Sequence, residues 1–103
     1  GLEQGLLEAA SLLGDGASAV LLVVAEETPP ELYAPFIDDV PFSYTVALLL
    51  TPGNDWQLSL QPGSGPRAEW PHALQLVRAL SSGQRTLQHY CKNRHWSWSC
   101  NKA

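Results

Sequence analysis

The stretch GLEQGLLEAASLLGDGASAVLLVVAEE, residues 1–27, joins a helical pattern directly to an unbroken apolar run. Apolar side chains in its first half recur at the spacing of one helix face. These side chains are Leu2, Leu6, Ala9, Ala10 and Leu13. Gly14 follows where a helix commonly ends, since glycine adopts the left-handed conformation without strain. Residues 19–25 (AVLLVVA) are then apolar at every position, which is typical of a strand buried on both faces in an α/β sheet.

Two further strands are expected after this run. Residues 43–51 (SYTVALLLT) form a second apolar strand, which Pro52 and Gly53 end. Residues 55–61 (DWQLSLQ) alternate between apolar and polar side chains, as in a half-buried or edge strand. The residues between the two apolar strands read as an irregular loop.

The last third of the chain predicts a helix and a hairpin. The helix spans Pro71 to Ser81, with Pro71 at the first helical position and Gly83 just beyond the end. Its apolar stripe consists of Ala73, Leu76, Val77 and Leu80. Residues 85–100 (RTLQHYCKNRHWSWSC) alternate on both sides of Lys92-Asn93, which indicates a β-hairpin with its turn at that pair.

These elements leave the apolar strands incompletely covered. A strand that is buried on both faces needs a layer on each side of its sheet. One amphipathic helix precedes the two apolar strands and one follows them, and two short helices are too few to cover both faces. We therefore expect that the chain is part of a larger fold, or that it associates with another chain through the uncovered side of the sheet.

Composition and charge exclude several classes of protein. At 103 residues the chain is at most one domain. All six Lys and Arg lie from Arg67 onward, whereas nine of the ten acidic residues lie at or before Asp55. Six dispersed basic residues without a reader motif do not predict nucleic-acid binding. No apolar run reaches the ~20 residues that a membrane span needs.

The two cysteines, Cys91 and Cys100, lie in the last thirteen residues. A disulfide framework would need more cysteines in so short a chain, so we expect a reducing compartment and a cytoplasmic location. A bridge that closes the terminal hairpin is the alternative.

The sequence shows no catalytic constellation. His72, His89 and His95 have no carboxylate at the spacing of a triad or a metal site. Two of these histidines and both cysteines reach the ligand count of a structural zinc site. A strand pair places those side chains on alternating faces, however, so a polar hairpin face is the preferred interpretation. We predict no catalytic residue, no metal and no cofactor.

Acidic and aromatic side chains offer the remaining candidates. Glu26 and Glu27 follow the first apolar strand, but adjacent side chains of an extended chain point in opposite directions and make a poor acid/base pair. The aromatic loop after them either lines an apolar pocket or a partner surface, or folds back onto the core. Trp96 and Trp98 are expected to pack in the core in preference to stacking on a sugar or a base.

The order and spacing of these segments resemble the β-ketoacyl synthases, and most of all their chain-length-factor type. Residues 5–50 resemble the later part of the family's N-terminal half. There a GLLEA helix precedes a buried strand that ends in an acidic pair, here Glu26-Glu27, followed by an aromatic loop and an Ala-Leu-Leu-Leu strand. ALQLVRALSSG at residues 73–83 and the W-x-W of the tail also fit the family.

The resemblance implies an α/β, partial thiolase-like fold: a mixed sheet layered with helices, with a C-terminal β-hairpin. Residues 1–103 would form a single partial domain, and the family's earlier strands and nucleophilic cysteine would lie before Gly1. Cys91 and Cys100 do not match that nucleophile. The family's catalytic histidines and lysine belong to its C-terminal half, so no catalytic residue is carried over.

Chain-length factors are non-catalytic subunits that pair with a catalytic β-ketoacyl-ACP synthase and help to shape its acyl tunnel in fatty acid, polyketide or polyene biosynthesis. The resemblance therefore implies a catalytic ketosynthase partner in a heterodimer or higher assembly, contact with the remainder of the same chain, and acyl carrier protein as an indirect partner. Its candidates for tunnel or partner contact are Tyr33, Phe36, Ile37 and Phe42. The alternatives are a fragment of an active synthase whose nucleophile lies upstream, and a small α/β interaction module.

Overall fold

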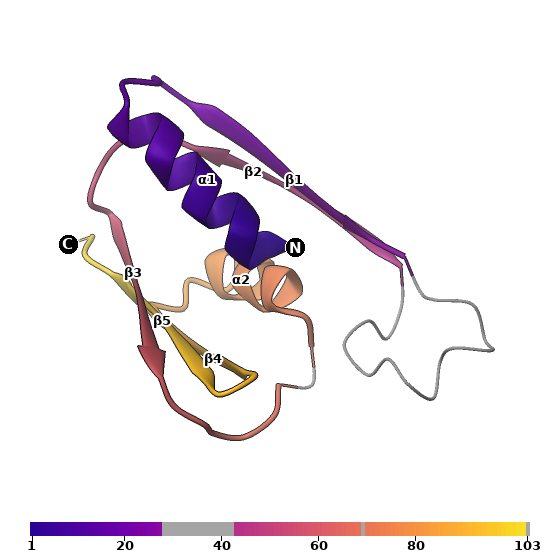
Figure 1. Ribbon diagram of the computed structural model, residues 1–103. Helices are drawn as coiled ribbons and strands as arrows, with labels where there is room; N and C mark the ends of the chain where they lie inside the picture. Colours follow the sequence, from indigo (N-terminus) through magenta and orange to yellow (C-terminus); the bar gives the residue numbers. More distant parts are fainter. Residues whose placement is uncertain (28–42, 69, 103) are drawn as a thin grey trace. The chain divides into compact units, whose positions relative to one another are not determined.

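The computed structural model describes residues 1–27, 43–68 and 70–102, which belong to two compact units, Gly1–Pro52 and Gly53–Ala103 (Figure 1). Among the described residues, the first unit contains one helix and two strands, and the second contains one helix and three strands. The charge asymmetry follows this division. The first unit has eight acidic and no basic residues, whereas the second has two acidic residues and all six basic ones.

The helix of the first unit is α1 (Leu2–Gly14), as predicted from the apolar spacing. The amide of Ala17 donates to the carbonyl of Leu12, which is the long hydrogen bond of a Schellman-type helix end. The residue with left-handed backbone is Gly16, at φ +109°. The glycine with left-handed backbone is therefore two residues later than predicted. Gly14 is the last helical residue, and Gly16 makes the turn.

The two strands of the first unit form an antiparallel ribbon. β1 (Val20–Glu26) and β2 (Tyr44–Leu50) pair along their whole length, from Val20 opposite Leu50 to Glu26 opposite Tyr44. Figure 1 shows α1 lying along this ribbon. The contact is close, because a Cβ added at Gly5 would lie 2.5 Å from Cδ1 of Leu22. Glycine at this position of the helix lets the β1 side chain approach the helix backbone.

The prediction that the first apolar strand is buried on both faces is wrong for the described residues. Burial alternates along β1 and β2, with Val24 and Val46 buried on one face. On the other face Leu21, Val23 and Leu49 are 65%, 55% and 70% exposed. The physical reason is that α1 supplies only one layer. The exposed face is the uncovered side that the sequence led us to expect.

The second unit is built on a three-stranded antiparallel sheet in the order β3-β5-β4. Its strands are β3 (Trp56–Pro62), β4 (Thr86–Cys91) and β5 (Arg94–Cys100). The hairpin predicted from the tail is confirmed, because β4 and β5 are joined by Lys92 and Asn93 at φ 52° and 62°. Two consecutive positive φ angles are the signature of a type I′ turn. The edge position predicted for β3 is also confirmed.

Register gives this sheet one apolar and one polar face. On the apolar face, both tryptophans of β5 lie opposite leucines of β3 and opposite Leu87 and His89 of β4. On the polar face, Ser99 of β5 lies between Gln57 of β3 and Thr86 of β4. Ser97 lies between Ser59 and Gln88 in the same way. Trp96 and Trp98 are buried, which confirms their predicted role in core packing.

The helix of the second unit, α2 (His72–Ser81), begins one residue later than predicted, since Pro71 is its N-cap. Gly83 has φ +72° and follows the end of the helix, as expected. The face of α2 that is buried differs from the apolar stripe predicted from the sequence. The buried side chains are His72, Ala73, Leu76 and Ala79. Leu80 is 44% exposed instead, because the buried histidine at the start of α2 shifts the packed face toward small side chains.

The α/β fold class is confirmed, and the strand pairs within the described residues are all antiparallel. Neither helix in the described part of the chain combines the length and the apolarity of a membrane-spanning segment.

Candidate functional site

The four residues predicted to contact a tunnel or a partner lie outside the described residues. Tyr33, Phe36, Ile37 and Phe42 all fall between residues 28 and 42. Their role remains a prediction, and the candidate surfaces below come from the remainder of the chain.

The first candidate is the outer face of the β1–β2 ribbon, the face turned away from α1. Its members are Leu21, Val23, Ala25, Thr45, Ala47 and Leu49. Leu21 is directly opposite Leu49, and Val23 is directly opposite Ala47. Five of the six side chains are apolar and none is charged. A contiguous exposed apolar face of this kind marks a surface that another layer covers.

Where β1 ends and β2 begins, Tyr44 lies opposite Glu26. Burial raises the pKa of the Tyr44 phenol above its usual value, and the negative charges of Glu26 and Glu3 raise it further. The phenol is therefore a neutral hydroxyl at physiological pH. Tyr44 shares the inner face of the ribbon with Val46, so it is not part of the outer face.

A buried network of aromatic side chains ties α2 to the sheet of the second unit. The rings of His72 and His89 stack with centroids 4.2 Å apart and 9° between their planes. The indole N–H of Trp98 donates to Nε2 of His72 over 2.9 Å. Nδ1–H of His89 donates to Oε1 of Gln75 over 2.6 Å. These bonds assign Nε2 of His72 as an acceptor and Nδ1 of His89 as a donor.

The preferred interpretation of His89 as part of a polar hairpin face is wrong. His89 is buried on the apolar face of the sheet, directly opposite Trp96. The signal was present in the sequence, because counting outward from the Lys92-Asn93 turn places His89 on the tryptophan face. His95 is on the polar face, where its ring stacks on Tyr90 with centroids 4.4 Å apart.

The two cysteines are free thiols at opposite ends of the hairpin. Cys91 lies opposite Arg94 beside the turn, whereas Cys100 ends β5 opposite Trp56. Six residues of extended strand separate the two levels by about 20 Å. A disulfide requires Cα atoms within about 7 Å, so the hairpin geometry rules out the bridge that the sequence left open.

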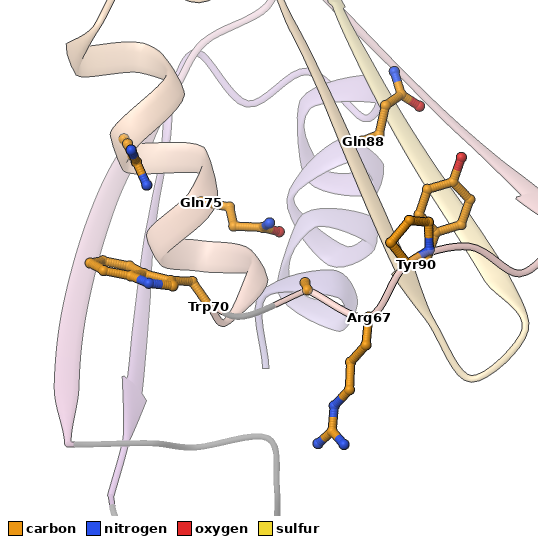
Figure 2. A pocket seen from close by; sticks show the side chains of 8 residues that line it. Arg67, Trp70, Gln75, Gln88 and Tyr90 are labelled. Atoms are coloured by element: carbon orange, nitrogen blue, oxygen red, sulfur yellow. The ribbon is translucent and has the colours of Figure 1, made fainter.

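The second unit also contains a cavity of about 480 Å³ between the start of α2 and β4 (Figure 2). Its described lining residues are Pro66, Arg67, Ala68, Trp70, Gln75, Arg78, Gln88 and Tyr90. Figure 2 shows Gln75 reaching from α2 toward β4, which carries Gln88 and Tyr90. None of these residues was predicted from the sequence to form a site, because they come from a loop, a helix and an edge strand and share no motif.

Comparison with known proteins identifies the family. The model of the β-ketoacyl synthase N-terminal domain matches residues 1–99. Among solved structures, a chain in the complex of the ketosynthase ApeO with its chain length factor ApeC from Xenorhabdus doucetiae is 29% identical, with a TM-score of 0.83. The match covers 94% of this chain and 42% of that one, so the chain spans less than half of its structural relative. No curated protein matches.

The match to the family model extends over almost the whole chain and the thiolase-type fold agrees with it, so the resemblance found in the sequence is confirmed. The chain belongs to the β-ketoacyl synthase family, in the N-terminal domain.

Proposed function

We propose that the chain is a non-catalytic, chain-length-factor type of ketosynthase-like subunit. In this role it pairs with a catalytic β-ketoacyl-ACP synthase in the cytoplasm and helps to shape the tunnel that holds the growing acyl chain. Condensation takes place on the partner, and acyl carrier protein delivers the substrates to that partner.

The observation that carries this proposal is the uncovered outer face of β1–β2. Leu21 and Leu49 lie side by side on this face and are about two-thirds exposed. In a family whose matched structure is a complex of a ketosynthase with its chain length factor, such a face favours burial against further protein.

The positions of the cysteines indicate that neither of them is the family's nucleophile. Cys91 and Cys100 are the only cysteines of the chain, and both lie in hairpin strands. A nucleophile of this chemistry is expected at a strained turn between a strand and a helix, where its side chain is presented to substrate. Neither position resembles that setting.

Reconstitution with the cognate ketosynthase and acyl carrier protein tests the proposal. We expect the double variant Cys91→Ser/Cys100→Ser to support the same rate of malonyl decarboxylation and condensation as the unchanged chain. We also expect the trapped acyl group to be found by intact mass on the ketosynthase polypeptide. An acyl group on the polypeptide that carries this chain would instead identify an active synthase.

A second measurement tests the tunnel assignment. Phe36→Ala, in the loop proposed to contact the tunnel, should lengthen the products of the reconstituted system, because removing an aromatic side chain extends an apolar cavity. Phe36→Leu, which preserves most of the volume, is the matched control. Identical product lengths for all three proteins would contradict the assignment.

A further inference from the structure

β3 is an edge strand of the second unit's sheet, and its outer edge is unpaired within the described part of that unit. The strand pairs with β5 along its whole length without a bulge. Its seven residues include no charged side chain, and its one proline is the last of them. Natural proteins usually protect an exposed edge with charges, prolines or bulges. An edge without these features is suited to pair with a further strand.

The backbone hydrogen bonds to β5 determine which groups of β3 point outward. The amide of Asn101 donates to the carbonyl of Asp55. At the other end of the strand, the amide of Gly63 donates to the carbonyl of Asn93. Hydrogen-bonded pairs alternate with non-hydrogen-bonded pairs in an antiparallel ladder, so the odd-numbered residues of β3 bind β5. The even-numbered residues therefore direct their N–H and C=O groups away from the sheet. They are Trp56, Leu58, Leu60 and Pro62, of which the proline offers only its carbonyl.

The opposite edge of the sheet, on β4, is partly occupied by the chain itself. The amide of Cys100 donates to the carbonyl of Arg85, so Thr86 is among the residues of β4 that point outward. The carbonyl of Thr86 accepts a hydrogen bond from the side-chain amide of Gln84 over 2.7 Å. Among the described residues, the outer edge of β3 has no comparable side-chain cap.

The sequence of β3 is complementary to itself. Residues 57–61 read Gln-Leu-Ser-Leu-Gln, which is the same in both directions about Ser59. When a second copy of β3 is placed antiparallel about a two-fold axis at Ser59, similar residues meet across that axis. Glutamine and serine then continue the polar face of the sheet, and leucine continues the apolar face, so the alternation of both sheets is preserved. The opposed pairs are Gln57 with Gln61, Leu58 with Leu60, and Ser59 with Ser59.

The same register pairs the outward backbone groups. Leu58 of one copy exchanges both N–H···O=C bonds with Leu60 of the other, and Leu60 does the same with Leu58. At each end, the N–H of Trp56 donates to the carbonyl of Pro62, which needs no N–H for this bond. The axis also coincides with the middle of the strand, since Ser59 is the fourth of its seven residues. Every residue of β3 therefore lies opposite a residue of the second copy.

We propose that the outer edge of β3 is a self-association site, at which a second copy of this chain pairs antiparallel about a two-fold axis at Ser59. The two three-stranded sheets then form one sheet in the order β4-β5-β3-β3-β5-β4. Such an interface is isologous and closes after two copies. The lack of charge on β3 favours it, because like charges placed opposite each other are destabilising. The proposal concerns the second unit alone and holds whether or not the proposed function is correct.

Disulfide trapping on the purified native assembly tests the pairing and its register. A single pair of seven-residue strands is a smaller contact than the ~1,200 Å² or more of a stable interface, so a covalent trap is the suitable measurement. In a chain that carries Cys91→Ser and Cys100→Ser, Ser59→Cys places one thiol at the axis. The Cα atoms of a non-hydrogen-bonded pair are about 4.5 Å apart, within disulfide range. We expect oxidised glutathione to link two copies of this chain, detected as twice its mass without reductant. Absence of the linked pair would overturn the proposal.

Ser97→Cys in the same cysteine-free chain is the matched control. Ser97 lies opposite Ser59 on the same face of the sheet, one strand further in, and both serines are half-buried. Three strand spacings, about 14 Å, would separate the two copies of Ser97, which is too far for a disulfide. Equal linkage of the two variants would show that the thiols meet by random collision, and it would refute the pairing.

A second pair of variants tests the strand contact itself. Leu60→Lys, added to Ser59→Cys, should slow the formation of the linked pair about tenfold or more, because a charged side chain on an edge strand opposes pairing. Leu80→Lys is the control, since Leu80 on α2 is also 44% exposed and lies outside β3. Equal rates for these two variants, in proteins that melt alike, would contradict the proposal. Linkage of Ser59→Cys to the ketosynthase instead would show that a strand of that protein occupies the edge, and the proposal would be wrong.

Discussion

Leu21→Asp is the substitution that most sharply separates a covered outer face from an exposed one. Leu21 is 65% exposed, and full burial of a leucine side chain contributes about 1.5–3 kcal/mol. Covering the exposed fraction therefore contributes about 1–2 kcal/mol. A carboxylate buried there without a partner costs several kcal/mol more. We expect the association with the ketosynthase to weaken by about 3 kcal/mol or more, which is over 100-fold in Kd.

The assay is affinity co-purification with a tagged cognate ketosynthase, followed by size-exclusion chromatography with light scattering. Leu80→Asp is the control, because Leu80 is an exposed leucine of α2 outside the outer face and undergoes the same chemical change. The control should retain the complex, whereas Leu21→Asp should lose it. If Leu21→Asp assembles and melts like the unchanged protein, the outer face is not covered in the assembly and the reasoning fails.

Three further substitutions test the packing and the electrostatics. Trp98→Phe removes the hydrogen bond that the indole donates to buried His72, so the free energy of unfolding measured in urea should fall by about 0.5–1.5 kcal/mol. Gly65→Ala places a methyl group against Tyr90, and overpacking should lower that free energy by about 1–3 kcal/mol. The raised pKa of Tyr44 stabilises the fold fully below pH ~10, and this contribution is lost as the pH rises through the pKa of the folded state. Tyr44→Phe should therefore flatten the loss of stability above pH ~10.

Each of these predictions has a control or a contradicting result. Gly63→Ala is the control for Gly65→Ala, because the added Cβ would meet only Cβ of His95 at 3.5 Å, an ordinary contact. Equal effects at the two glycines would contradict the packing argument. An unchanged midpoint of urea unfolding for Trp98→Phe would show that the indole hydrogen bond contributes nothing to stability. For Tyr44, the measurement is an absorbance titration of the phenols in alkali, made on the unchanged protein and on Tyr44→Phe. The same midpoint in both proteins would contradict the raised pKa.

Local signals made the elements predictable from the sequence. The apolar spacing before Gly14 specified α1, and the alternation around Lys92-Asn93 specified the hairpin to the residue, because a two-residue turn fixes the register of both strands. Register in turn determined that Trp96 and Trp98 share a face. Patterns of this kind depend only on residues close together in the chain.

The features that could not be predicted depend on tertiary packing. Residues 19–25 are uniformly apolar, so their sequence does not indicate which face of the strand is covered. Both faces of β1 were therefore predicted to be buried, whereas α1 covers only one of them. The rotation of α2 follows from burying His72 beneath Trp98, a pairing of residues 26 positions apart. The cavity is assembled from three segments that are separate in the sequence and share no motif.

We propose that this member of the β-ketoacyl synthase family works as the non-catalytic partner of a ketosynthase. Native mass spectrometry of the protein after co-expression with its cognate ketosynthase tests that claim most directly. We predict one complex with equal numbers of the two polypeptides and no separate population of either. A ketosynthase without this protein, beside a lone monomer that unfolds in one sharp transition, would contradict the claim.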